Sequence, residues 1–297
     1  MSHEDLNEEI AMTFSIIVVS YNAGAKLHET VESIRRQTEE DYEIIVQDGL
    51  STDGSVGKLS IGEDLKLYTG EDAGIYDAMN RAVAHASGRY IFFLNCGDYF
   101  ADDMVLARVK REIEKSDRHV TLKGGEGKHG KTHLPPRIFY GNIRERATGA
   151  HVMSNPRIDD FACYRNVPCH QACFYDRRLL VKRGFRIRYR VRADYEHFLW
   201  CYYRAHASMV YMPLTVASYE GGGFSEKEGS RKRSREEHAR IVRKYMSRGQ
   251  ILKYRFLLFI TFSRLRTYLS SNKRTAAIYQ NLIRRMYRKR QEPPIDV

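Results

Sequence analysis

The chain lacks several features that mark secreted and membrane-spanning proteins. Its 297 residues include five cysteines, an odd number at irregular spacing, which indicates reduced thiols rather than a disulfide framework. A very apolar stretch, residues 251–262, is well short of the ~20 residues that a membrane-spanning helix needs. Residues 1–12 are acidic and polar, without the basic and apolar regions of a signal peptide. We therefore expect a protein that remains in the cytoplasm.

Three kinds of site are disfavoured. No G-x-G-x-x-G follows the first apolar run, which argues against a dinucleotide-binding protein. A glycine-rich segment at residues 123–131 is interpreted as a solvated polar loop rather than a phosphate cradle. The cysteines and histidine between residues 163 and 173 do not have the paired C-x₂-C spacing of a structural zinc site. Cys96 and Cys201 lie in apolar stretches and are expected to be small buried side chains.

Strand and helix patterns alternate along the first hundred residues. Apolar runs typical of buried strands occupy residues 14–22, 42–47 and 89–94. Helical spacing of apolar residues recurs over residues 26–37, and a second helix is expected to run from residue 72 to a stop at Gly88. This alternation predicts a parallel sheet built from right-handed crossovers, so the predicted fold class is α/β.

Polar residues follow the ends of these predicted strands. Tyr21-Asn22 end the first run, Asp48 comes directly after the second, and Asp98 lies just beyond the third. Open α/β sheets bind their ligands at the carboxyl ends of the strands. In the second helix, Asp72, Tyr76 and Asn80 are spaced one turn apart and are predicted to share a face.

These motifs resemble the inverting family 2 glycosyltransferases, which have the GT-A fold, a Rossmann-like domain with a mostly parallel central sheet. In that family a Tyr-Asn pair ends the first strand and a loop of the type Asp-Asp-Gly-Ser-Thr-Asp-Gly follows the second. Here Tyr21-Asn22 and Asp48 match, while Gly49 replaces the second Asp. The family's Asp-x-Asp-Asp metal motif is here Asn95-Cys96-Gly97-Asp98 and keeps only its last carboxylate. The resemblance implies a donor nucleotide-sugar site made by Tyr21, Asn22, Asp48, Asp72, Asn80 and Asn95.

The resemblance extends to small bacterial transferases similar to those of colanic acid and other surface polysaccharide synthesis. In that subgroup a His-Gln pair precedes a strand, an Ala-Asp-Tyr segment opens a helix, and a Gly-Gly-x-Ser loop follows. This chain has His170-Gln171, Ala193-Asp194-Tyr195 and a loop ending at Ser225. The resemblance therefore implies a GT-A domain over residues 12–226.

It also implies a division of labour between two carboxylates. An inverting transfer needs one base to take the proton of the attacking hydroxyl, and Asp194 is the expected general base, with Glu196 as the alternative. Asp98 is the expected ligand of Mg²⁺ or Mn²⁺, because a hard cation can be held by one carboxylate together with substrate phosphates and waters. A metal-free site with cationic side chains around the diphosphate stays open. His170, Gln171 and Ser225 are candidates for acceptor or diphosphate binding, and His170 could equally be a core histidine.

The charge is concentrated in the last quarter of the chain. Residues 227–297 contain 20 Lys and Arg against 5 Asp and Glu, so the formal charge of +12 for the whole chain leaves a slightly acidic remainder. Apolar residues at helical spacing include Ile251, Tyr254 and Leu258, and a final helix would group Tyr279, Leu282, Ile283 and Met286. We interpret residues 227–297 as a basic amphipathic helical tail at an anionic membrane surface, which would place the protein at the inner face of the cytoplasmic membrane. Packing on the domain or on another subunit is the alternative.

The expected activity is transfer of a sugar from a UDP- or GDP-linked donor to a hydroxyl of a glycan or polyprenyl-diphosphate-linked acceptor in polysaccharide biosynthesis. Two other classes of protein are alternatives. A nucleic-acid-binding protein would use the basic tail, but the rest of the chain is acidic and carries no nucleic-acid motif. A sugar nucleotidyltransferase would need a basic, glycine-rich loop after the first strand, and residues 20–25 contain no cation.

Overall fold

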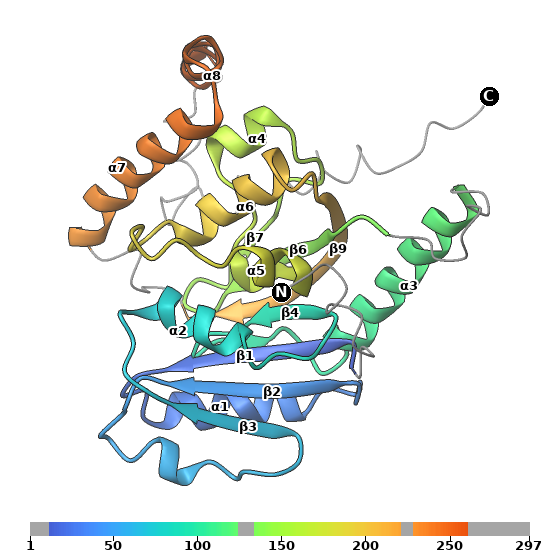
Figure 1. Ribbon diagram of the computed structural model, residues 1–297, viewed down its shortest axis with the longest axis vertical. Coiled ribbons are helices and arrows are strands. Elements are labelled where there is room, and N and C mark those ends of the chain that lie inside the picture. Colours follow the sequence, from blue (N-terminus) through green and yellow to red (C-terminus); the bar gives the residue numbers. More distant parts are fainter. Residues whose placement is uncertain (1–11, 124–133, 221–227, 261–297) are drawn as a thin grey trace. The chain divides into compact units, whose positions relative to one another are not determined.

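The computed structural model describes residues 12–123, 134–220 and 228–260 (Figure 1). The chain divides into two compact units, Met1–Ile241 and Val242–Val297. The Gly-Gly-x-Ser loop with Ser225 and the predicted final helix around Tyr279 lie outside the described residues. The predicted domain boundary near residue 226 stays a prediction.

The first unit is built on a nine-stranded sheet with the order β3-β2-β1-β4-β8-β6-β9-β5, with β7 pairing β6. The parallel part consists of β1 (Phe14–Ser20), β2 (Tyr42–Asp48), β3 (Leu65–Thr69) and β4 (Tyr90–Phe93). The remaining strands are β5 (Tyr99–Phe100), β6 (Arg137–Glu145), β7 (His151–Val152), β8 (Cys173–Asp176) and β9 (Ser208–Tyr219). Strand β8 is antiparallel to both β4 and β6, whereas β6 and β9 are parallel. The predicted α/β class is confirmed.

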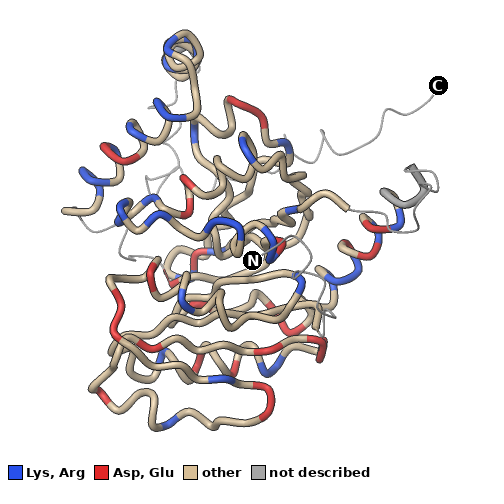
Figure 2. Tube along the Cα trace, in the orientation of Figure 1, with Lys and Arg blue, Asp and Glu red and all other residues tan. Residues whose placement is uncertain are grey.

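The described residues form helices in both units (Figure 1). They are α1 (Ala25–Arg35), α2 (Ile75–Val83), α3 (Val105–Lys123), α4 (Asp160–Arg165), α5 (Arg177–Lys182), α6 (Ala193–Tyr203), α7 (Glu228–Tyr245) and α8 (Arg248–Ile260). Short 3₁₀ turns occupy Val56–Lys58 and His170–Ala172. Figure 2 shows that Lys and Arg recur closely along α7.

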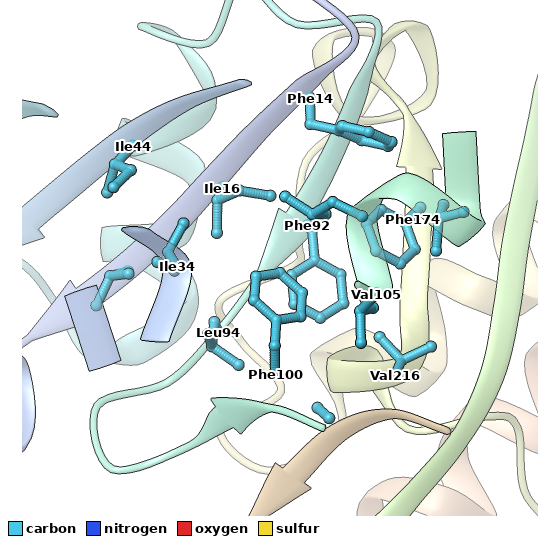
Figure 3. Packing of buried hydrophobic residues seen from close by; sticks show 14 of the residues in the cluster. Phe14, Ile16, Ile34, Ile44, Phe92, Leu94, Phe100, Val105, Phe174 and Val216 are labelled. Atoms are coloured by element: carbon cyan, nitrogen blue, oxygen red, sulfur yellow. The ribbon is translucent and has the colours of Figure 1, made fainter. Parts of the chain in front are cut away.

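The main core lies between the sheet and α1 and α3. Alternate residues of β1, among them Phe14 and Ile16, point to this side and are fully buried, as their period of two predicts. Phe92 of β4 stacks on Phe174 of β8 and on Phe100, with ring centroids 4.5 Å and 5.2 Å away (Figure 3). These aromatic contacts join the parallel and antiparallel parts of the sheet into one core.

The second predicted helix is shorter than expected. It was expected to start at Asp72 and to reach Ser87, but α2 spans only Ile75–Val83. The next turn is held by a buried carboxylate instead: Glu43 accepts hydrogen bonds from the backbone N–H and the hydroxyl of Ser87, each at 2.7 Å. A Cβ on Gly88 would lie 2.5 Å from the backbone of Phe14 and Ser15, so the chain can enter β4 this close to β1 only with glycine at that position.

Glu43 is therefore a central tie of the parallel sheet. Its side chain is 2% exposed and also accepts from the Ser15 hydroxyl at 2.7 Å and from the Lys66 ammonium at 2.9 Å. Burial by itself would raise the pKa of Glu43, but the hydrogen bonds from Lys66, Ser87 and Ser15 outweigh it and lower that pKa.

We predict that Glu43→Gln lowers the free energy of unfolding by about 1–3 kcal/mol at pH 7, because Lys66 loses its charged partner inside a buried network. The folded-state pKa lies below the unfolded value of about 4.3, so the stabilisation is present above that pH and is lost as the pH falls through the folded pKa. Urea unfolding at pH 7 and pH 3.5 measures both effects. Asp102→Asn, which breaks an exposed ion pair with Arg108, is the matched control. An equal difference between wild type and Glu43→Gln at both pH values would contradict the assignment.

Candidate active site

Most of the predicted site residues meet at one edge of the sheet. Strands β1, β2 and β4 are parallel neighbours, so their carboxyl ends bring Asn22, Asp48 and Asn95 to the same side of the molecule. This is the edge at which open α/β sheets bind ligands.

Asp48 shapes the loop after β2. Its carboxylate is 1% exposed and accepts from the backbone N–H of Ser51 at 2.8 Å and from the Ser51 hydroxyl at 2.5 Å. The same hydroxyl accepts from the Asn22 backbone N–H at 2.7 Å, and the Asn22 side-chain oxygen accepts from the Thr52 N–H at 2.9 Å. Tyr21 beside it is 69% exposed. The two predicted donor loops are thus locked together around Asp48, with the Tyr21 ring facing solvent.

Asp72 lies before α2 rather than in it, where it accepts from the Gly74 N–H at 2.8 Å. A Cβ on Gly49 would lie 2.6 Å from an Asp72 carboxylate oxygen and 3.4 Å from the Tyr21 ring. The Asp72 carboxylate therefore occupies the space into which a side chain at position 49 would project. Gly49, which replaces the family's second Asp, therefore lies at the point where the Asp72 carboxylate comes close to the loop.

Two predicted residues are not brought to this edge. The Asn80 amide pairs with the backbone of Phe185, donating to its carbonyl at 2.9 Å and accepting from its N–H at 2.7 Å. Glu196 is fully buried and forms an ion pair with Arg183. Both side chains hold α2 and α6 against the segment between them.

Asp98 lies in a tight turn beyond β4. Its backbone N–H donates to the Asn95 carbonyl at 2.9 Å, and Gly97 has φ of +91°, a backbone conformation that favours glycine. The Asp98 carboxylate is 6% exposed and accepts from the Gln171 amide and from the backbone N–H of Glu220 at 3.1 Å. Burial raises the pKa of Asp98, although these two hydrogen bonds act in the opposite direction.

Asp194 occupies the first turn of α6 and has a different environment. One carboxylate oxygen accepts from the Tyr195 N–H at 2.8 Å and from the Tyr76 hydroxyl at 3.0 Å, and the other faces His170 Nδ1 at 3.1 Å. Burial would raise the pKa of Asp194, but the hydrogen bond and charge of His170 and the bonds from Tyr195 and Tyr76 outweigh it and lower that pKa. The carboxylate is held in its ionised form.

His170 joins the two carboxylate regions. Its Nε2 lies 3.2 Å from the Asn95 side-chain nitrogen, which can only donate, while its Nδ1 faces Asp194. A ring with its proton on Nδ1 donates that proton to a hydrogen bond with Asp194. A continuous path of hydrogen bonds therefore runs from Asn95 through His170 and Asp194 to Tyr76. The linking role of Tyr76 was not predicted, although its one-turn spacing from Asp72 singled it out.

The described part of the chain contains no cluster of three or more His, Cys, Asp or Glu side chains that could hold a metal ion. All five cysteines are free, and burial raises the pKa of Cys96 to about 12. Residues 125–132 match the letters of a P-loop, G-x-x-x-x-G-K-T, outside the described residues. They follow helix α3 instead of a strand, so the structural context of a P-loop is missing.

The family match shows that this protein is an enzyme that transfers glycosyl groups. Residues 15–184 match the family model Glycosyl transferase family 2, and the chain belongs to that family. A PGL/p-HBAD biosynthesis glycosyltransferase of Mycobacterium bovis is 36% identical over 222 residues, covering 72% of this chain and 80% of the relative. This membership favours the expected glycosyltransferase over the two alternative classes.

Solved structures share the GT-A fold. S. aureus TarS 1-349 in complex with UDP-GlcNAc has a TM-score of 0.58 at 16% identity, covering 88% of this chain and 76% of that one. The chain spans 37% of a longer TarS structure. The Pyrobaculum calidifontis mannosyltransferase PcManGT, in complex with GDP-Man and Mn²⁺, has a TM-score of 0.57 at 16% identity, covering 97% of this chain and 86% of that one.

We predict that His170→Ala raises the pKa of Asp194, because the substitution removes the strongest of the hydrogen bonds that lower it and leaves the effect of burial. Carbon-13 NMR titration of the Asp194 carboxyl, assigned by its loss in Asp194→Asn, measures the shift. His85→Ala, which removes a ring stacked on Tyr68, is the control histidine. An unchanged titration of Asp194 in His170→Ala would show that the ring does not act on the carboxylate.

Proposed function

We propose that this glycosyltransferase moves a sugar with inversion from a nucleotide-diphosphate-sugar to a hydroxyl of a glycan or lipid-linked acceptor, with Asp194 as general base. The observation that carries the proposal is the Asp194 carboxylate. It is ionised, partly exposed, and held in place by Tyr76, Tyr195 and His170. A fixed, charged carboxylate is what a base for a sugar hydroxyl requires.

In the proposed reaction the acceptor oxygen attacks the anomeric carbon from the face opposite the diphosphate. The new carbon–oxygen bond forms as the bond to the phosphate oxygen breaks, and the hydroxyl proton passes to Asp194. The electron pair of the broken bond leaves on the nucleotide diphosphate. Since Tyr76 and His170 already orient the carboxylate, little of it has to rearrange when the acceptor arrives.

On the donor side, we propose that Asp48, Asn22 and Tyr21 line the nucleotide site. The complexes of TarS with UDP-GlcNAc and of PcManGT with GDP-Man support a UDP- or GDP-linked sugar. Asp98 is the proposed ligand of Mg²⁺ or Mn²⁺, and the Mn²⁺ in PcManGT agrees with that chemistry. The fit rests on its position at the strand-end turn and on its two carboxylate oxygens, held by Gln171 and Glu220. A bound divalent cation would neutralise the leaving diphosphate.

The relative from M. bovis is named for PGL/p-HBAD biosynthesis, which supports a glycolipid or polysaccharide acceptor.

A membrane-bound acceptor would suit α8 in the second unit. Leu252, Phe256 and Phe259 recur at helical spacing and are 69%, 61% and 81% exposed, a different face from the one predicted around Ile251. Arg243, Arg248 and Arg255, with Met246, Ile251 and Leu252, line a hollow of about 610 Å³. No helix within the described residues is long and apolar enough to cross a membrane. We propose that the protein docks on the anionic inner face of the cytoplasmic membrane.

Asp194→Asn keeps the size of the side chain but cannot accept a proton. We expect turnover to fall by ~10²–10⁴ while donor binding stays within a few-fold of wild type. Sugar transfer from a panel of UDP- and GDP-sugars and calorimetric binding of the donor measure the two effects. Asp103→Asn, at an exposed ion pair with Arg36, is the control. Transfer within a few-fold of wild type would place the base elsewhere.

Phe256→Ser combined with Phe259→Ser should weaken binding of the full-length protein to vesicles containing anionic lipid, and should remove chiefly the part of the binding that resists salt. Removing residues 250–297 should abolish the binding and spare donor hydrolysis. Co-sedimentation at low and high salt measures both. Ile61→Ser, an apolar residue 61% exposed on the first unit, is the matched control. If the wild-type protein ignores anionic vesicles at low salt, membrane docking is wrong.

A further inference from the structure

An ion pair lies beside the turn that carries Asp98. The Lys26 ammonium is 2.5 Å from a carboxylate oxygen of Glu220, and both side chains are about half exposed. Lys26 belongs to the start of α1, and Glu220 directly follows β9. The backbone N–H of Glu220 also donates to Asp98 at 3.1 Å. The backbone of Glu220 is thus held at the Asp98 carboxylate, although the two residues are 122 positions apart in sequence.

Gly97 shows which space this pair fills. A Cβ on Gly97 would lie 3.1 Å from the Lys26 side chain and 3.4 Å from the Glu220 carboxylate oxygen. The pair therefore occupies the space into which a side chain at position 97 would project. The family's metal motif has an Asp at this position, and here Glu220, which follows β9, brings a carboxylate oxygen to within 3.4 Å of that Cβ position.

A second cation near this turn, Arg146, is held by several contacts. The Arg146 guanidinium donates to the carbonyl of Gly97 at 2.6 Å and to that of Ser218 at 3.3 Å, and it lies 4.2 Å from the centroid of the Tyr99 ring. These contacts fix it as a static positive charge. Lys26 differs, because a single exposed ion pair contributes little net free energy and its long side chain can change partner readily.

We propose that Glu220 is a second carboxylate ligand of the divalent cation beside Asp98, and that Lys26 moves from Glu220 to the donor diphosphate when the cation binds. The inference rests on the proposed function of this edge as the donor site. Without the cation, Lys26 neutralises Glu220. With the cation, two carboxylates balance its charge, and Lys26 is released to face the phosphates next to Arg146. In this proposal Glu220 supplies the carboxylate that the metal motif lacks. Lys26 neutralises Glu220 until the cation binds.

The test uses the full-length protein with two probes, Mn²⁺ alone and inorganic diphosphate, measured by isothermal titration calorimetry. Glu220→Gln should weaken binding of Mn²⁺ alone by about tenfold or more, because one ligand charge is removed. The same variant should bind diphosphate more tightly than wild type in EDTA, because Lys26 has lost its competitor. Lys26→Gln should do the reverse: Mn²⁺ binding is kept or improved, and diphosphate binding falls with and without metal.

Two reference variants make the outcome specific. Glu29→Gln removes a nearby carboxylate that accepts from the Tyr99 hydroxyl at 2.5 Å, and it should change neither measurement. Asp98→Asn should abolish Mn²⁺ binding. If Asp98→Asn does so while Glu220→Gln binds Mn²⁺ as wild type does, the role of Glu220 is overturned and the proposed donor site stands. If the wild type binds neither probe, the proposed donor site fails as well. Unchanged melting temperatures of the variants verify that each one is folded.

Discussion

The hydrogen bonds of His170 to Asn95 and Asp194 connect the turn after β4 with the first turn of α6. They exist because β8 runs antiparallel to β4, with Phe92 opposite Phe174. In an antiparallel pair the beginning of one strand lies beside the end of the other. The 3₁₀ turn before β8 therefore brings His170 and Gln171 next to the turn after β4, where Gln171 reaches Asp98 and His170 reaches Asn95. The antiparallel pairing of β8 with β4 therefore links the turn after β4 to α6 through His170.

The two main carboxylates differ because their surroundings differ. Asp98 is buried and receives two hydrogen bonds, and burial raises its pKa. Asp194 receives bonds from a ring N–H, a hydroxyl and a backbone N–H, and these lower its pKa in spite of burial. A pair of acids pushed apart in this way is a common arrangement where one carboxylate serves as base and the other has a separate role. Here His170 is the largest of the influences that lower the pKa of Asp194, whereas the two hydrogen bonds to Asp98 do not offset its burial.

Where prediction from sequence differed from the structure, distant contacts decided the outcome. The early end of α2 depends on Glu43, which bonds Ser87 across 44 residues. Asn80 matched a helix face toward the site, yet its amide pairs with the backbone of Phe185. Glu196 lies two residues from Asp194, but the turn of α6 points it at Arg183 in the core. Each of these buried polar side chains pairs with a polar group that is distant in sequence. The spacing of residues along the chain does not reveal which group that is.

The sequence by itself determined the α/β class, the parallel strands β1, β2 and β4, and the polar turns at their ends, because buried strands leave apolar runs and turns leave short polar segments in the local sequence. It also singled out Asp98 and Asp194 through their motifs. Only the tertiary structure placed Tyr76 and His170 on Asp194, and Lys26 and Glu220 beside Gly97. These partners are up to 194 residues apart, and which of them meet depends on strand order and direction, for which no local pattern exists.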